Sequence, residues 1–325
     1  MAKNNLPYTI IRPATHEEWL EERKKGIGSS EVGTILGVNK WDTPYKLWRR
    51  KKELDPPVEE TLIMKLGHYF EQAVAQCFAD ETGATIIKNT AGDWIAVSKE
   101  HDFFRVSPDR LYYPKGAKKV PQNRCILECK TTRMNIDPEN LPKYWWCQIQ
   151  YQMHVLGIKH GALAWIKNGT EFGYCEIDYN PRFAEFMSTA LEAFWWRHME
   201  NNEEPPVESV EDVMSKFPES TPDSVCVSRE SEVFRAWMEL KEIKAQLSVL
   251  DEKKKACENM LKMEMKECDC LTVKDPAGGA EILCTWRTPA KPTMKFDDKT
   301  FKEVHPKLYE DFCKPTIGPR RFVMK

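Results

Sequence analysis

The chain has no long hydrophobic run. None of its apolar stretches approaches the roughly 18 residues that a membrane-spanning helix needs. Residues 1–9 also lack the apolar segment of a secretory signal. We therefore expect a cytoplasmic protein that makes no use of a membrane.

Clustered cysteines are missing as well. The sequence has 11 cysteines, an odd number, and no two of them stand in a Cys-x-x-Cys pair. A zinc or iron–sulfur site needs four thiolates or imidazoles at close spacing. The scattered cysteines therefore favour reduced, free thiols in a reducing compartment over a metal cluster.

The chain carries no large excess of charge of either sign. Its 48 basic and 50 acidic residues give a formal net charge of −2, which argues weakly against a nucleic-acid partner. Basic residues nevertheless cluster at 23–25, 49–52, 115–119 and 320–321. Each cluster is either a phosphate-facing surface or an ordinary solvated face, and the sequence leaves both readings open.

The order of expected elements indicates an α/β fold. Helices are predicted over 15–24, 43–52, 61–81, 142–156 and 180–200, and strands over 85–88, 94–97, 103–107, 110–113, 124–130, 162–166 and 172–179. The helix over 142–156 can cross between parallel strands. We therefore expect a mixed central sheet flanked by helices.

The last third of the chain has a different composition. A polar, proline-containing stretch leads us to divide the chain into a domain over 1–200, a linker over 201–227 and an accessory region over 228–325. The accessory region begins with a helical pattern from Glu230 to about Cys268, which fits a long arm, a coiled coil or a broken helical hairpin. A β-hairpin over 271–287 and a basic tail follow.

Two short segments supply acidic residues and a lysine, namely Ser107-Pro108-Asp109 and Ile126 to Lys130. Side chains alternate along a strand, so Glu128 and Lys130 share one face and Cys129 lies on the other. Two carboxylates can hold Mg²⁺, and an ammonium can orient a water or neutralise charge during phosphodiester hydrolysis. A surface ion pair on a sheet edge is the plainer reading of the same residues.

Four segments together resemble a known family. They are Gly26 to Val32, Gly67 to Glu71, the Asp109 and Glu128-Cys129-Lys130 segments, and Gln148 to Met153. In this order they resemble the YqaJ family of viral recombination nucleases and, through it, the lambda-type alkaline exonucleases. The resemblance covers roughly residues 18–200 and implies a PD-(D/E)xK, restriction-endonuclease-like core.

The resemblance also implies roles for individual residues. Asp109 and Glu128 match metal ligands, the carbonyl of Cys129 would add a third oxygen, and Lys130 matches the catalytic lysine. Glu71 matches a helix carboxylate that faces the metals, and Gln148 a glutamine behind the site. The implied cofactor is Mg²⁺, for which Mn²⁺ can substitute, with two ions per site.

A pocket for a 5′-terminal phosphate follows from the same resemblance. Ser30 matches a hydroxyl that contacts this phosphate, and Ser107 is a second candidate. Lys24 aligns where lambda-type enzymes have an arginine, and Arg23 stands beside it. Lysine lacks the bidentate fork of arginine, so this pocket departs from the family pattern.

Two further departures lie next to the catalytic residues. The family commonly has glycine after Ser-Pro-Asp, where this chain has Arg110, and an aliphatic residue where it has Cys129.

The implied function is a metal-dependent exonuclease of viral recombination. It would degrade the 5′-ended strand of linear double-stranded DNA in an infected or lysogenic host cell and leave a 3′ tail. The family further implies a homo-oligomer in the form of a trimeric ring, and a single-strand annealing protein as partner. A nicking or structure-selective endonuclease, and a non-catalytic DNA- or partner-binding protein, are the alternatives.

Overall fold

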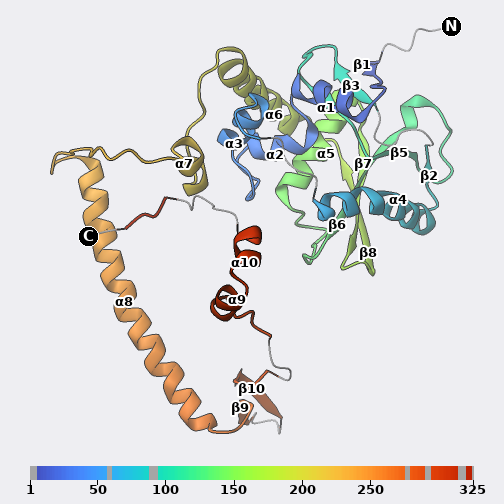
Figure 1. Ribbon diagram of the computed structural model, residues 1–325. Coiled ribbons are helices and arrows are strands. Elements are labelled where there is room, and N and C mark those ends of the chain that lie inside the picture. Colours follow the sequence, from blue (N-terminus) through green and yellow to red (C-terminus); the bar gives the residue numbers. More distant parts are fainter. Residues whose placement is uncertain are drawn as a thin grey trace. The chain divides into compact units, whose positions relative to one another are not determined.

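The computed structural model describes residues 6–56, 61–87, 94–274, 279–289, 294–313 and 320–323. It divides into two compact units, residues 1–217 and 218–325, which are described separately (Figure 1). Among the described residues, no helix is both long enough and apolar enough to cross a lipid bilayer.

A mixed five-stranded sheet forms the centre of the first unit. Its strands lie in the order β2 (Thr85–Ile86), β5 (Arg110–Tyr113), β6 (Cys125–Thr132), β7 (His160–Lys167) and β8 (Glu171–Asp178). Strands β6 and β7 run parallel, whereas the other neighbours in this sheet are antiparallel. A parallel pair needs a crossover connection, which α5 (Lys143–Leu156) supplies. The prediction of a mixed α/β sheet is confirmed.

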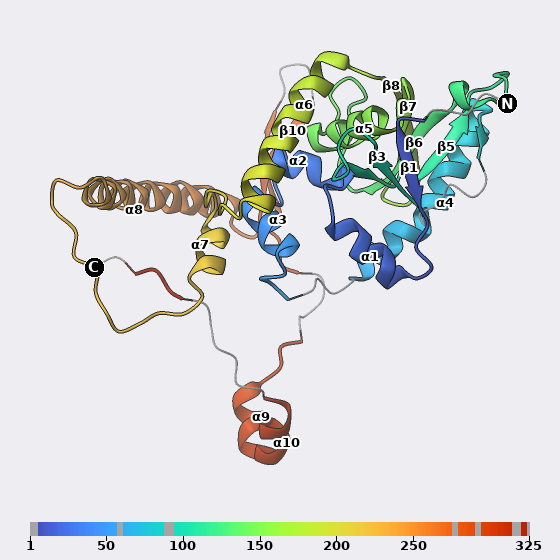
Figure 2. The same cartoon turned by 90° about the horizontal axis from the view of Figure 1, so that it is seen from above.

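Helices cover both faces of this sheet, as Figure 2 shows. On one face α4 (Leu62–Thr82) packs with Leu127 and Cys129 of β6; on the other, α5 and α6 (Pro181–Phe194) pack with Ile126. The central strand is therefore buried on both sides, which explains its nearly continuous apolar sequence. Beyond Phe194 the chain continues as a π-helical turn, Trp195–Glu200.

A smaller antiparallel sheet and three short helices complete the N-terminal part. The sheet has the order β1 (Tyr8–Ile11), β3 (Ile95–Ser98) and β4 (Arg105–Val106). The helices are α1 (His16–Lys24), α2 (Val32–Ile35), which follows a 3₁₀ turn at Ser29–Glu31, and α3 (Pro44–Lys51). A Cβ on Gly33 would stand 2.6 Å from Cβ of Tyr144, so glycine lets α2 lie directly against α5.

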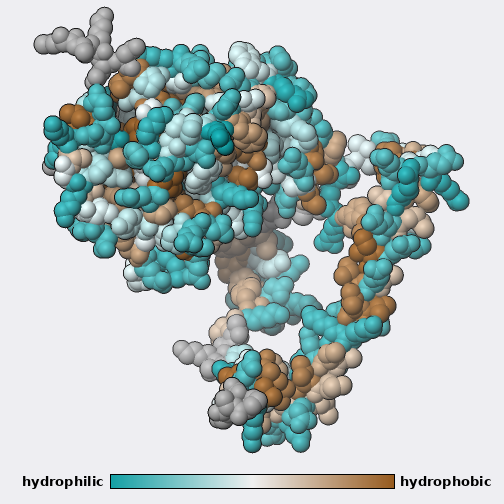
Figure 3. Space-filling model, turned by 180° about the vertical axis from the view of Figure 1, so that it is seen from behind, coloured by the Kyte–Doolittle hydropathy of each residue, from teal (hydrophilic) through white to brown (hydrophobic). Residues whose placement is uncertain are grey.

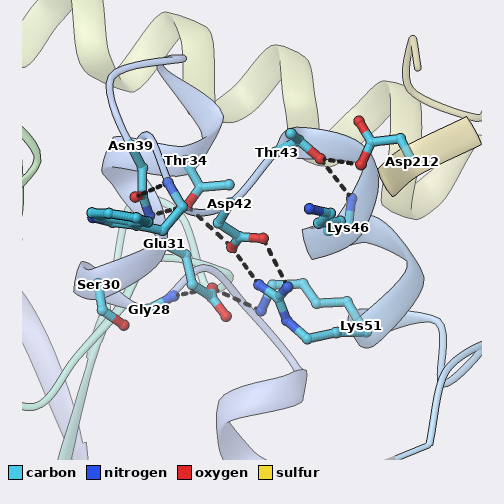
Figure 4. A network of polar contacts seen from close by, with 12 residues as sticks. Gly28, Ser30, Glu31, Thr34, Asn39, Asp42, Thr43, Lys46, Lys51 and Asp212 are labelled. Atoms are coloured by element: carbon cyan, nitrogen blue, oxygen red, sulfur yellow. Dashed lines mark hydrogen bonds and ion pairs between the residues drawn. The ribbon is translucent and has the colours of Figure 1, made fainter. Parts of the chain in front are cut away.

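The segment that we assigned to a linker contains a helix of the first unit. Val210–Lys216 form α7, and Ser209 and Asp212 cap its start reciprocally. Asp212 is fully buried and accepts a 2.8 Å hydrogen bond from Oγ1 of Thr43 (Figure 4). We had assigned this segment to a linker from its acidic and proline-rich composition, which gave no sign of the capping box. The division between the units falls after Phe217.

The second unit is built around α8 (Glu232–Met265), which begins at the cap residue Ser231. This helix is continuous, so the broken-hairpin reading of the sequence is wrong. The expected β-hairpin is present as β9 (Cys270–Lys274) and β10 (Ala280–Thr285); most of its turn lies outside the described residues. Two short helices follow, α9 (Asp298–Val304) and α10 (Pro306–Phe312).

Candidate active site

The two predicted catalytic carboxylates meet where β5 begins beside β6. Arg110 lies opposite Leu127 in the antiparallel register, so continuing by one residue places Asp109 opposite Glu128. The carboxylate of Asp109 accepts a 2.8 Å hydrogen bond from the backbone N–H of Cys129. The pairing of β5 with β6 therefore brings together Asp109 and Glu128, which come from separate segments of the sequence.

Pro108 explains why the carbonyl of Cys129 is suited to a metal. The next step of the register places Pro108 opposite Cys129, whose N–H and C=O both point toward the β5 side. Proline has no N–H to donate. Pro108 therefore cannot donate a hydrogen bond to the carbonyl oxygen of Cys129, as another residue at this position would.

Glu128 is held by three donors in the interior. It is 1% exposed, and its Oε1 accepts hydrogen bonds from Nζ of Lys130, at 2.6 Å, and from Nε2 of Gln148. Its Oε2 accepts a 2.8 Å hydrogen bond from Nε2 of Gln152. A buried carboxylate needs such partners, because removal from water is otherwise costly.

Gln152 is the residue of this cluster that the sequence analysis did not single out. It is fully buried, its Nε2 also lies 3.3 Å from Oγ of Ser29, and its Oε1 has no hydrogen-bond partner among the described residues. The signal was present in the sequence, since Gln148 and Gln152 are four residues apart and share one face of α5. Gln152 links Glu128 to the turn at Gly26–Ser30.

Each charge of the site shifts the pKa of its neighbours. Burial, and after it the negative charge of Glu128, raises the pKa of Asp109 well above its usual range. Burial lowers the pKa of Lys130, but the carboxylates of Glu128 and Asp109 outweigh it, and the net shift is upward. Lys130 is therefore a fixed ammonium, and the two acids repel each other in the absence of a cation.

The oxygen atoms present fit a hard divalent cation. An ionised carboxylate has about four lone-pair positions, of which the hydrogen bonds named above use three on Glu128 and one on Asp109. In the described part of the chain, no group of three or more His, Cys, Asp and Glu side chains is arranged around a metal position. The ligands would thus be two carboxylates, the Cys129 carbonyl and waters, as suits Mg²⁺.

Glu71, the predicted helix carboxylate, lies at the edge of this cluster on α4. Its Oε1 is 3.1 Å from Nδ1 of His68, and its Oε2 is 3.6 Å from Nη1 of Arg110. Its charge contributes to the raised pKa of Asp109, so it lies close to the site. The arginine that departs from the family pattern therefore supplies a positive charge to Glu71.

Of the two basic residues predicted to bind the phosphate, one lies beside Ser30 and the other forms ion pairs with glutamates. Ser30 is exposed, and Nη2 of Arg23 lies 3.4 Å from its Oγ. Lys24 instead makes ion pairs with Glu21 at 2.5 Å and Glu53 at 2.6 Å. The structure thus brings Arg23, rather than the aligned Lys24, to Ser30.

Internal bonds hold the turn that carries Ser30. The N–H of Gly28 donates to Glu31 at 2.7 Å, and Glu31 pairs with Nζ of Lys51 at 2.8 Å (Figure 4). Ser107, the other candidate hydroxyl, donates to the carbonyl of Trp94 at 2.8 Å. Its hydroxyl hydrogen is therefore used to fix the loop before Asp109.

Comparison with known proteins assigns the N-terminal part of the chain. Residues 18–159 match the family described as the YqaJ-like viral recombinase domain. This part of the chain is therefore similar to a YqaJ-like viral recombinase domain. The uncharacterized protein YqaJ of Bacillus subtilis (strain 168) is 27% identical over 323 residues, which cover 96% of this chain and 94% of that protein. This similarity to YqaJ therefore includes both units.

Several solved structures are similar to part of this chain. An alkaline exonuclease (LHK-Exo) from Laribacter hongkongensis has a TM-score of 0.44 at 15% identity, covering 57% of this chain and 93% of that one. Its complex with dAMP has a TM-score of 0.45 at 15% identity, with 62% and 97% covered. A phage-related exonuclease from Haemophilus somnus 129PT has a TM-score of 0.39 at 12% identity, with 55% and 96% covered.

Proposed function

We propose that the YqaJ-like domain is a metal-dependent deoxyribonuclease that degrades linear double-stranded DNA from its 5′ ends and leaves 3′ single-stranded tails. The observation that carries the proposal is the cluster of Asp109, Lys130 and the buried Glu128, with Gln148 and Gln152 fixing Glu128. A surface ion pair would not need a carboxylate that is 1% exposed and bound by three donors.

The residues divide the chemistry among them. Asp109, Glu128 and the carbonyl of Cys129 would hold Mg²⁺, or Mn²⁺ in its place, which when bound stabilises the attacking and leaving oxygens of phosphodiester hydrolysis. Lys130 is fixed against Glu128 and lies 3.1 Å from Oε1 of Gln148, so its ammonium is positioned to orient a water or neutralise phosphate charge. We propose two ions per site, the second of which would require Glu71.

An exonuclease must also recognise a DNA end. Arg23 and Ser30 would bind the 5′-terminal phosphate through a guanidinium and a hydroxyl. The contacts of Gln152 with Ser29 and Glu128 would set the distance between this phosphate and the catalytic carboxylates. Fixing the terminal phosphate would hold the scissile bond in a productive position.

The family description, a viral recombinase domain, supports a role in DNA recombination. On the resemblance stated above, we propose that the protein works as a homo-oligomer in the form of a trimeric ring around DNA. We further propose that a single-strand annealing protein receives the 3′-tailed product.

Digestion of two DNA substrates tests the proposed activity. Linear, 5′-phosphorylated duplex and closed-circular duplex are incubated with Mg²⁺ and the wild type, Lys130→Ala or Lys167→Ala, a matched lysine on the neighbouring strand. We expect mononucleotides from the linear substrate alone, with the wild type and Lys167→Ala. Cutting of closed circles would indicate an endonuclease, and binding without cleavage would indicate a DNA-binding protein.

A further inference from the structure

The long helix α8 (Glu232–Met265) leaves its apolar side chains uncovered. Met265 is its one buried residue, whereas Val233, Leu247 and Leu250 are 64%, 58% and 57% exposed. Figure 3 shows apolar side chains along much of this helix. Helices in water derive most of their stability from packing of an apolar face, and the described residues of the second unit do not supply a partner for the apolar side chains of α8.

Apolar residues occupy most of the a and d positions of a seven-residue repeat in α8, and other apolar residues, such as Trp237 and Met260, lie outside it. Positions a are Val233, Leu240, Leu247, Lys254 and Leu261, and positions d are Ala236, Ile243, Leu250, Cys257 and Glu264. All except Lys254 and Glu264 are apolar, and the repeat extends over about four heptads. Apolar residues at a and d over this length are typical of a coiled coil.

The charges beside this seam distinguish the possible arrangements. In a parallel, in-register pair, each g residue faces the e residue of the following heptad on the other helix. Glu239 at g then faces Lys244 at e, and Lys253 at g faces Glu258 at e. These pairs are complementary in both directions, because the two helices are equivalent. The flanking positions therefore favour a second copy of the same helix.

We propose that α8 binds α8 of a second copy of this chain as a parallel, in-register, two-stranded coiled coil. A single lysine at an a position, here Lys254, specifies the register and the number of strands of a coiled coil. In a two-stranded seam its long stem packs against the partner while the ammonium reaches water. This interface lies in the second unit and does not depend on the nuclease site, and together with the proposed trimeric ring it would join two rings into an assembly of six chains.

Cys257 provides a direct probe of the pairing, because it is exposed in the single chain and occupies a d position. The in-register arrangement brings the two Cys257 side chains together across the seam. The full-length protein is prepared with the other exposed cysteines, Cys226, Cys268 and Cys313, changed to serine. We expect mild oxidation with diamide to convert most of the chain into a disulfide-linked dimer.

Matched variants separate pairing from chance collision. Cys257→Ser should abolish the linked dimer, and Asn259→Cys in that background, which faces away from the seam, should not restore it. Leu247→Glu, at an a position, should also abolish it, whereas Glu252→Lys, on the outer face of the same helical turn, should leave it unchanged. Circular dichroism checks that the helix content is retained.

Three results would overturn the proposal. One is the absence of the Cys257 dimer in a folded protein. Another is cross-linking that requires an added Leu240→Cys, which would indicate antiparallel helices. The third is a mass of three chains by light scattering that falls to one chain in Leu247→Glu, which would indicate three strands.

Discussion

Replacing Gln152 by methionine separates the catalytic role of the amide from its contribution to folding. Methionine has nearly the same length but no amide. The change removes the 2.8 Å hydrogen bond to Oε2 of Glu128 and the 3.3 Å contact with Ser29. It also removes Oε1 of Gln152, a buried acceptor without a partner among the described residues.

The two effects on stability have opposite signs. A hydrogen bond to a charged group contributes about 1.5–3 kcal/mol, and a buried polar atom without a partner costs about 1–3 kcal/mol. The free energy of unfolding of Gln152→Met should therefore stay within about 1 kcal/mol of the wild type. Glu128 loses one of the donors that orient it, which should lower nuclease activity about 10- to 100-fold, as is typical for groups that position a metal ligand.

Gln150→Met is the matched control on the same helix. Gln150 is equally buried, but its amide donates to the carbonyl of Asp178 and accepts from the N–H of Asn180, both at 2.8 Å. Its replacement leaves two backbone groups without partners, so it should lower the free energy of unfolding by about 2–5 kcal/mol while the folded enzyme stays active.

Urea unfolding and nucleotide release measured below the unfolding range compare the two variants. Full activity in Gln152→Met, or a loss of stability as large as that of Gln150→Met, would refute the assigned role of Gln152.

Three further predictions concern charge. Arg110→Gly should free Glu71 from its 3.6 Å contact and tighten Mg²⁺ binding, measured by calorimetry; unchanged or weaker binding would contradict this role. Because burial and Glu128 raise the pKa of Asp109, a proton competes with Mg²⁺ for this carboxylate, so the apparent Mg²⁺ affinity should rise with pH; an affinity independent of pH would contradict this. Burial lowers the pKa of His154, so as the pH falls below about 6.5 this histidine binds a proton in the unfolded chain before it does so in the folded one. The free energy of unfolding should therefore decline between about pH 6.5 and the lowered pKa. Urea unfolding should show a smaller decline in His154→Phe; an equal decline would contradict the assignment.

The expected secondary structure followed from local signals. Thr15, Thr43 and Thr61 each cap a helix at the position that the sequence indicated, and Gly83 ends α4 in the left-handed conformation with φ of 72°. The alternation that separates Glu128 from Cys129 is a property of any strand, and it is present in β6.

Contacts between distant segments were beyond the sequence pattern. Arg23 rather than Lys24 lies beside Ser30, and the ammonium of Lys24 instead pairs with Glu53, 29 residues away in the sequence. The burial of Asp212 against Thr43 spans 169 residues, and composition alone suggested a linker there. Such contacts depend on tertiary packing, which cannot be predicted from the spacing of apolar residues along the sequence.

The central claim is that Glu128 is part of a metal-dependent nuclease site. The most direct test is nucleotide release from linear, 5′-phosphorylated duplex DNA over a Mg²⁺ titration. It compares the wild type, Glu128→Gln and Glu176→Gln, which replaces an exposed glutamate on strand β8 of the same sheet. We predict Mg²⁺-dependent release by the wild type and Glu176→Gln, and none by folded Glu128→Gln. Release by Glu128→Gln at the wild-type rate and Mg²⁺ dependence would contradict the account.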